Sequence, residues 1–163
     1  MLLQDNFKEI SKEEIIKFFF DTVYKLALSQ TKNKADAEDI SQEVFLRYIK
    51  QTKSFESMEH IKAWLIRVTI NRCHSHFSSI HRKKMVELTE EIPFDTPEKG
   101  EVYYAVSELA PKYRVVIHLF YYEDMAISEI SRCLGKNEST VKSQLKRGRE
   151  MLKNKLKRDY DYV

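Results

Sequence analysis

Residues that interrupt helices are scarce in this chain. Its 163 residues include three glycines and three prolines, whereas average usage would give roughly 11 and 8. A chain this poor in turn residues cannot make the many tight turns of a β-sandwich or barrel, nor the glycine-rich phosphate loop of many α/β proteins. Hydrophobic residues make up 42% of the sequence, which is enough for a core. The composition therefore predicts an all-α protein with long helices.

Apolar periodicity predicts three helices in the first half of the chain. The first carries a stripe that begins at Ile15 and reaches Leu26, and a polar break follows at 31–34. The second is expected from near Asp36 to about Lys53. The third, over about 60–80, is apolar on most sides and so belongs at the centre of a bundle. The buried face of the second helix is expected to contain Ala37, Ile40, Val44 and Tyr48, with Phe45 and Ile49 beside it.

Charge divides the sequence into three parts. The total is +3, but residues 1–85 and 108–163 each carry +4, while residues 86–107 carry −5. The acidic middle also contains two of the three prolines and breaks the apolar periodicity. We therefore predict two small helical domains, 1–84 and 101–163, joined by a flexible acidic linker at 85–100. Within the second domain, residues 132–158 carry +8, which favours a polyanionic partner or a solvated helix face.

The basic segment has the pattern of a helix-turn-helix. A short helix is expected to end at Leu134, followed by Gly135, which can adopt the left-handed backbone that stops a helix. Asn137 can cap a longer helix over about 138–157. Its apolar stripe includes Gly148, where close helix packing is expected. The opposite face carries Lys142, Ser143, Lys146, Arg147, Arg149 and Lys153, donors suited to phosphates and base edges.

The remaining sequence excludes several classes of protein. No apolar run approaches the ~18 residues of a membrane span, and the charged start does not resemble a signal peptide. We therefore expect a cytoplasmic protein without membrane insertion. The sequence lacks a phosphate loop, a zinc-protease motif and a nucleophile elbow, so we predict no enzymatic activity and no cofactor. A metal site at Cys73, His74, His76 and His81 is disfavoured because Cys73 lies on the apolar stripe.

The second predicted helix has a second face, away from its core stripe. Asp39, Gln42, Glu43 and Leu46 follow one another at i, i+3, i+4 and i+7. An acidic and amide face with one exposed leucine suits docking on a partner helix that carries arginine. The alternative is a solvated face with a Glu43–Arg47 pair, which contributes only tenths of a kcal/mol.

Three stretches of this sequence resemble the extracytoplasmic-function (ECF, group IV) sigma factors of the bacterial sigma-70 family. The first is DAEDISQEVF at 36–45, and the second is AWLIRVTINRC at 63–73. The third is ELAPKYR at 108–114, continued by ISEIS at 127–131 and STVKSQLKRGR at 139–149. The stretches occur in the family's order and spacing, across an acidic linker. The resemblance covers about residues 10–158.

The resemblance implies a protein that directs promoter-specific initiation of transcription. The first domain would be sigma region 2, which binds the clamp coiled coil of core RNA polymerase and reads and melts the −10 promoter element. The second would be region 4, which binds the polymerase flap and reads the −35 element. The expected partners are thus core polymerase, promoter DNA and an anti-sigma factor. The open alternatives are a helix-turn-helix regulator that acts without polymerase and an all-helical adaptor.

The resemblance also assigns residues to these surfaces. In the family, the loop that corresponds to 55–60 captures a base flipped out of the DNA. Phe55 and Met58 would form the walls of that pocket, and Ser57 or Glu59 would contact the edge of the base. Polymerase would bind Asp39, Gln42, Glu43 and Leu46. The −10 element would bind Phe55, Ser57, Met58, Arg67 and Asn71. The −35 element would bind Thr140, Lys142, Ser143, Lys146, Arg147 and Arg149.

Four positions depart from the family pattern. Lys136 lies in the turn where an apolar residue is usual, and Gln144 replaces a usual arginine. Lys146 occupies a position that is often histidine or aromatic, and Met125 is assigned to a position where glycine is common. These departures leave the predicted fold intact and affect the expected −35 sequence preference.

Overall fold

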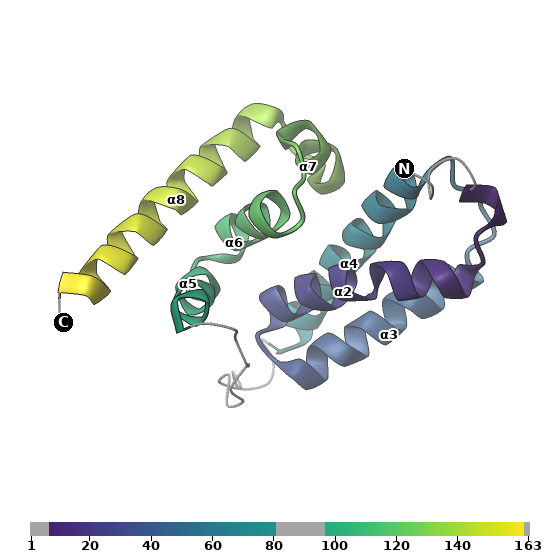
Figure 1. Cartoon of the computed structure of the whole chain (residues 1–163), viewed down its shortest axis with the longest axis horizontal. Coiled ribbons are helices and arrows are strands. Elements are labelled where there is room, and N and C mark those ends of the chain that lie inside the picture. Colours follow the sequence, from purple (N-terminus) through teal and green to yellow (C-terminus); the bar gives the residue numbers. More distant parts are fainter. Residues whose placement is uncertain (1–6, 81–96, 162–163) are drawn as a thin grey trace. The chain divides into compact units, whose positions relative to one another are not determined.

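All the elements of the described structure are helical, which confirms the all-α prediction. The computed structural model describes residues 7–80 and 97–161, with side chains for 7–76 and 100–157 (Figure 1). The chain divides into two compact units, Met1–Val86 and Glu87–Val163. Most of the predicted linker lies outside the described residues. Its last four residues, 97–100, are helical and belong to the second unit.

The first unit is a bundle of three long helices preceded by a short 3₁₀ turn. The turn, η1, spans Phe7–Glu9, and the helices are α2 (Lys12–Thr31), α3 (Lys34–Lys50) and α4 (Met58–Ile80). Each helix contacts the other two. The interior between them is mainly apolar, and all three helices contribute large side chains with almost no exposure. They are Val23, Leu26, Ile40, Val44, Ile61, Leu65 and Ile66.

Local capping sets the ends of these helices. The Ser11 hydroxyl accepts a hydrogen bond from the backbone of Glu14 at 3.2 Å and caps α2. The α2 helix ends at Lys32, which adopts the left-handed φ of 55°. Asn33 then caps α3 by accepting from the Asp36 backbone at 3.0 Å. The cap is therefore Asn33, and Asp36 occupies the first turn.

The predicted buried face of α3 is confirmed except at one residue. Ala37, Ile40, Val44, Phe45 and Tyr48 are buried, but Ile49 is 50% exposed. Beside Ile49, the Lys12 ammonium donates hydrogen bonds to the carbonyls of Ile49 and Gln51 at 2.9 and 3.0 Å. These bonds satisfy carbonyls at the end of α3. The Ile49 side chain is left facing solvent, on the side away from the bundle.

The second unit contains four α-helices and one π turn. They are α5 (Pro97–Ser107), α6 (Pro111–Ile117), the π turn η2 (His118–Tyr122), α7 (Ile127–Leu134) and α8 (Glu138–Asp161). Pro111 lies in the first turn of α6, where its fixed φ suits the helix and its missing N–H is not needed. The α8 helix contacts α5, α6 and α7 (Figure 1). The core of the unit includes Val116, Ile117, Leu119, Ile130, Val141 and Leu145.

Gly148 allows α8 to lie close to α6. A methyl group at Gly148 would lie 3.2 Å from Cγ1 and 3.3 Å from Cδ1 of Ile117. These separations are shorter than an ordinary carbon contact of about 3.5–4.0 Å, so the absence of a side chain is what permits the approach. The close packing predicted at this glycine is confirmed.

Candidate nucleic-acid and polymerase interfaces

The predicted docking face of α3 is largely accessible. Asp39 and Gln42 are exposed, Leu46 is 53% exposed and Glu43 is half-buried. Ile49, one turn beyond Leu46, extends this face with a second apolar side chain. The sequence reasoning assigned Ile49 to the edge of the core. The i+3 spacing from Leu46 was the available signal for placing it on the outer face.

Glu43 is bound from a neighbouring helix. The Arg72 guanidinium of α4 donates to both carboxylate oxygens of Glu43, with an Nη2–Oε1 distance of 3.1 Å. The main partner of Glu43 is therefore Arg72 and not Arg47, the residue four positions away on the same helix. The hydrogen bond from Arg72 holds the pKa of the Glu43 carboxyl below its ordinary value, against the opposing effect of desolvation. The pairing fixes the orientation of Glu43 on the docking face.

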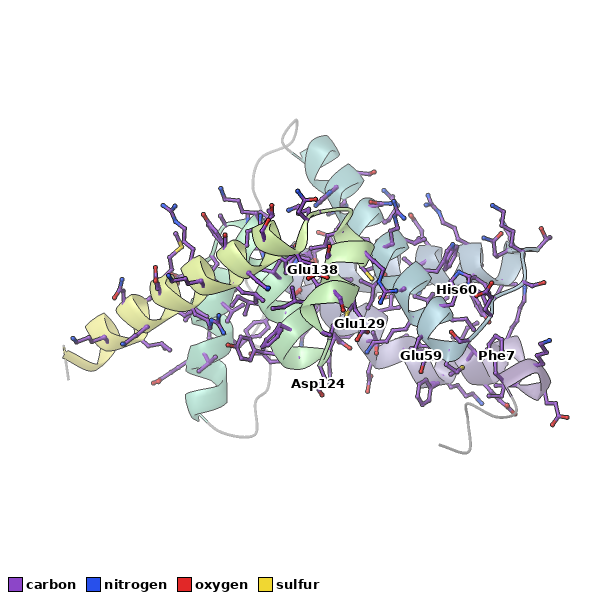
Figure 2. The ribbon with its side chains drawn as sticks, turned by 90° about the horizontal axis from the view of Figure 1, so that it is seen from above. Phe7, Glu59, His60, Asp124, Glu129 and Glu138 are labelled. Carbon is purple, nitrogen blue, oxygen red and sulfur yellow. The ribbon has the colours of Figure 1, made fainter. Side chains whose placement is uncertain are left out.

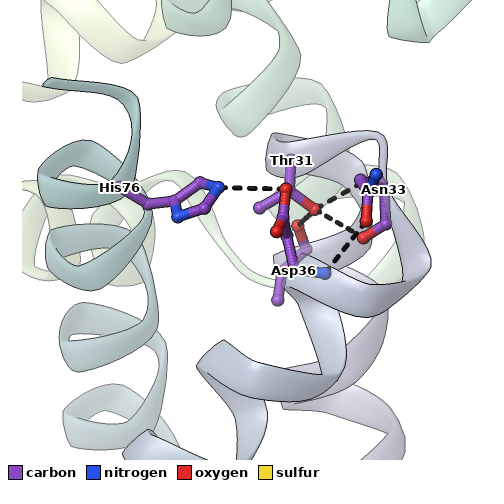
Figure 3. A network of polar contacts seen from close by, with 5 residues as sticks. Thr31, Asn33, Asp36 and His76 are labelled. Atoms are coloured by element: carbon purple, nitrogen blue, oxygen red, sulfur yellow. Dashed lines mark hydrogen bonds and ion pairs between the residues drawn. The ribbon is translucent and has the colours of Figure 1, made fainter. Parts of the chain in front are cut away.

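A second polar contact joins the same two helices one turn further along α4. His76 Nε2 lies 3.0 Å from the Asp36 carboxylate (Figure 3). Asp36 is itself held at the start of α3, where its backbone donates to Asn33, whose own backbone donates to the Thr31 hydroxyl at 3.4 Å. Arg72 and His76 lie one turn apart on α4, and their partners Glu43 and Asp36 lie seven positions apart on α3. Together they fix the rotation of α3 against α4.

The Glu43–Arg72 pair gives the first unit an acid-dependent stability. Because Arg72 lowers the pKa of folded Glu43 from 4.5, the stabilisation is present above that value and is lost as pH falls through the folded pKa. The Glu43 side chain is 43% exposed, so screening by water limits the effect to about 1 kcal/mol or less. We expect the free energy of unfolding to fall less between about pH 7 and pH 3 in Arg72→Met than in the unaltered chain. Urea unfolding at each pH measures it.

Glu38→Gln is the matched control for that experiment, since Glu38 is an exposed carboxylate of the same helix. It should keep the acid dependence of the unaltered chain. Equal acid sensitivity in Arg72→Met and in the unaltered chain would contradict the role of the pair.

The three loop residues expected to contact the −10 element organise the loop itself. The Ser57 hydroxyl accepts from the backbone of His60 at 3.0 Å and caps α4, while Met58 is buried. The Phe55 ring packs against three aromatic side chains, Tyr48, His60 and Trp64, at centroid distances of 5.9, 5.1 and 5.7 Å. The exposed residues of 55–60 are Glu56 in the loop and Glu59 and His60 in the first turn of α4, of which Figure 2 labels the last two.

One exposed stripe runs along α4, in place of the mostly apolar surface that the sequence predicted. Arg67 and Asn71 are both exposed and lie one turn apart on it. Three more residues share this stripe, because together with Arg67 and Asn71 they recur at spacings of three or four positions. They are His60, the half-buried Trp64 and the exposed His74. An aromatic ring among basic and amide groups is typical of a surface that stacks unpaired bases. His60, Trp64 and His74 are not among the predicted site residues, although their helical spacing from Arg67 can be read from the sequence.

The turn of the helix-turn-helix is closed by Ser131. Gly135 ends α7 with a φ of 63°, as predicted. The Lys136 backbone donates to the Ser131 carbonyl at 3.1 Å, and the Ser131 hydroxyl donates back to the Lys136 carbonyl. The turn is therefore closed by hydrogen bonds on both sides of Gly135 although Lys136 takes the place of the usual apolar residue. Asn137 precedes α8, and its backbone carbonyl accepts a hydrogen bond from the Val141 backbone at 3.1 Å. This places Asn137 at the expected N-cap.

The segment before α7 corrects one assignment. Asp124, and not Met125, adopts the left-handed backbone that favours glycine, with a φ of 51°. Met125 is 4% exposed and belongs to the core. The residue of this segment whose backbone would favour glycine is therefore Asp124. Short polar side chains such as aspartate are tolerated in this conformation.

The outer face of α8 presents the predicted donors to solvent. All six residues expected to contact −35 DNA are exposed: Thr140, Lys142, Ser143, Lys146, Arg147 and Arg149. The Ser143 hydroxyl donates to the Ser139 carbonyl at 2.9 Å. Arg149 donates to the Tyr121 hydroxyl of η2 at 3.2 Å. Glu150 is also exposed and places an acid one turn beyond Lys146.

Among the histidine and cysteine residues weighed as metal ligands, those that the structure describes do not come together as a site. Cys73 is fully buried and His76 faces Asp36, while His81 lies outside the described residues. Within the part of the chain that the structure describes, no group of three or more histidine, cysteine, aspartate or glutamate side chains is arranged to hold a metal ion. In the same residues, no helix combines the length and apolar character needed to cross a membrane.

The two units match the two parts of one protein class. A family model of Sigma-70 region 2 matches residues 19–83, and a model of Sigma-70 region 4 matches residues 99–152. The helical bundle and the basic helix-turn-helix thus define a sigma-70-type protein. The ECF RNA polymerase sigma factor SigM of Bacillus subtilis is 30% identical over 153 residues, which cover 86% of this chain and 92% of that protein. The chain belongs to the ECF RNA polymerase sigma factors.

Two further comparisons agree with this assignment. The ECF RNA polymerase sigma factor SigE of Mycolicibacterium smegmatis is 29% identical over 159 residues, covering 90% of this chain and 62% of that protein. This chain thus spans less than two thirds of that relative. The fold is similar to that of the sigma factor RpoE in its complex with the anti-sigma factor NepR from Bartonella quintana. The TM-score is 0.80 at 21% identity, covering 89% of this chain and 96% of RpoE.

Proposed function

We propose that this chain binds core RNA polymerase and directs promoter-specific initiation of transcription. The observation that supports this most strongly is the presence of two different exposed faces on neighbouring helices of one unit. The α3 face is acidic and apolar, with Asp39, Gln42, Leu46 and Ile49, which suits a protein partner. The α4 face is basic and aromatic, which suits unpaired DNA. The chain acts as a regulatory subunit in the cytoplasm and not as an enzyme.

In this proposal each domain has a separate task. Region 2, residues 1–84, docks on the polymerase clamp through α3 and contacts the −10 element through Arg67 and Asn71, with His60 and Trp64 beside them. Phe55, Ser57 and Met58 shape the adjoining loop. Region 4, residues 101–163, contacts the polymerase flap and presents α8 to the −35 element. Residues 85–96 of the predicted linker connect the two domains, since residues 97–100 belong to α5.

An anti-sigma factor is the regulatory partner that we propose. Support comes from RpoE, a protein of similar fold that was solved in complex with the anti-sigma factor NepR. An inhibitor that covers Leu46 and Ile49 would remove two exposed apolar side chains from water, which favours binding. It would also block the proposed docking face of α3.

Run-off transcription with purified bacterial core polymerase and a cognate promoter tests the proposed function. We expect the chain to bind core polymerase and to produce a specific transcript that core polymerase alone does not produce. A regulator that acts without polymerase would bind duplex DNA and give no transcript. An adaptor would bind neither core polymerase nor DNA, and either result would contradict the proposal.

A further inference from the structure

Two exposed side chains from different elements of region 4 meet beside the recognition helix. The Arg149 guanidinium of α8 donates a hydrogen bond from Nη1 to the phenolic oxygen of Tyr121 in η2, at 3.2 Å. Tyr121 is 49% exposed, and Arg149 is also exposed. The pair links residues 28 positions apart, so its presence depends on the tertiary structure.

The hydrogen-bonding chemistry of the pair leaves donors facing solvent. A phenol has one O–H donor and can accept as well, and guanidinium has five N–H donors. When the Tyr121 oxygen accepts from Arg149, its own proton remains available to an acceptor. The guanidinium keeps four further N–H groups. Two donors of fixed relative position and one positive charge are well suited to a phosphate oxygen.

The backbone around Tyr121 holds it in this position. The η2 segment is a π turn, closed by a 3.3 Å hydrogen bond from the Glu123 backbone to the His118 carbonyl. Single π turns inside helices occur frequently at functional sites. Gly148, next to Arg149, packs against Ile117, the residue that precedes η2, so closely that a Cβ at position 148 would lie 3.2 Å from Ile117 Cγ1. The close approach explains how a side chain of α8 reaches Tyr121.

The position along α8 distinguishes a phosphate contact from a base contact. Recognition helices present their N-terminal residues to the bases. Arg149 lies nine residues beyond Thr140, about 14 Å along the axis, which exceeds the major groove width of about 12 Å. Three further exposed cations share its side of α8 at helical spacing, namely Lys142, Lys146 and Lys153. The position of Arg149 at the far end of this stripe points to the DNA backbone and not to a base edge.

We propose that Tyr121 and Arg149 together form a binding site for a DNA backbone phosphate at the edge of the recognition helix. Arg149 supplies the charge, and Tyr121 orients the guanidinium and donates its hydroxyl proton to the same phosphate. Tyr121 is thus a binding residue that the sequence did not single out. The inference rests on the proposed function, since it requires region 4 to bind DNA.

The test compares Tyr121→Phe with Tyr122→Phe in the full chain. The two tyrosines are adjacent and have the same exposure, 49%, but the Tyr122 ring stacks on His118 at 5.3 Å. Binding to a fluorescein-labelled duplex of random sequence is followed by anisotropy at low salt, because phosphate contacts do not depend on base sequence. We expect Tyr121→Phe to weaken binding about fivefold, and Tyr122→Phe to change it less than about twofold.

A double-mutant cycle with Arg149→Met separates this site from a general effect on folding. Arg149→Met should reduce the salt dependence by about 0.9 in slope, and in that background Tyr121→Phe should have little further effect. Equal binding by Tyr121→Phe and Tyr122→Phe would overturn the inference, as would an undiminished effect of Tyr121→Phe without Arg149. If the unaltered chain fails to bind the duplex, the DNA-binding role of region 4 fails as well.

Discussion

Replacing both Arg67 and Asn71 by alanine is expected to leave core polymerase binding unchanged and to reduce open-complex formation at least about thirtyfold. Each contact to a base edge contributes about 1–3 kcal/mol, and 1.4 kcal/mol corresponds to a factor of ten. Both side chains are exposed on α4, away from the α3 docking face, so their loss should not affect folding or docking. Core binding is measured by competition and open complexes by permanganate footprinting.

The matched control is the double variant Glu13→Ala and Lys17→Ala. These residues form an exposed i, i+4 ion pair on α2, with side chains 81% and 77% exposed, so the control removes a similar amount of surface from another face. It should form open complexes as the unaltered chain does. A parallel loss of core binding and promoter opening in the Arg67 and Asn71 variant would remove the support for a DNA role on α4.

Replacing Gly148 by valine should destabilise the second unit by about 1–3 kcal/mol. The Cβ alone would lie 3.2 Å from Ile117 Cγ1, and the two valine methyls require still more space between α8 and α6. The helix propensity of valine is better than that of glycine by a few tenths of a kcal/mol, which is too little to offset the overlap. Each kcal/mol should lower the unfolding midpoint of a unit of this size by roughly 4–8 °C.

The partner substitution Ile117→Ala tests the cause. It removes the two atoms closest to a Cβ at position 148 and leaves Tyr113 Cβ at an ordinary contact distance of 3.5 Å. The double variant should therefore be less unstable than the two single effects predict, by more than about 1 kcal/mol. Simple additivity would show that the strain lies elsewhere. Calorimetry that resolves the two units gives the result directly.

Local signals of the sequence explain why the helices and the turn were predictable. Apolar periodicity, the left-handed Gly135 and the position of Asn137 all depend on residues within four positions of one another. The role of Ser57, in the loop before α4, was predicted less well. Ser57 is a frequent N-cap residue, and its hydroxyl is occupied by the His60 backbone, yet the family resemblance had assigned that hydroxyl to a base.

Contacts between helices could not be predicted in this way. Glu43 has Arg47 four residues away as a plausible partner, but it pairs with Arg72, 29 residues distant. Similarly, nothing local indicates that Arg149 reaches Tyr121. Such pairs depend on how far each helix rotates and how closely it approaches its neighbour, which the whole core determines through its packing.

By itself, the sequence determined that this chain is helical, that an acidic segment divides it into two domains, and that the second domain carries a basic helix-turn-helix. These properties follow from composition, period and caps, which act over one or two helical turns. Only the tertiary structure decided which side chains of each surface remain available and which are bound. The reason is that burial and pairing across helices depend on packing between segments far apart in the chain.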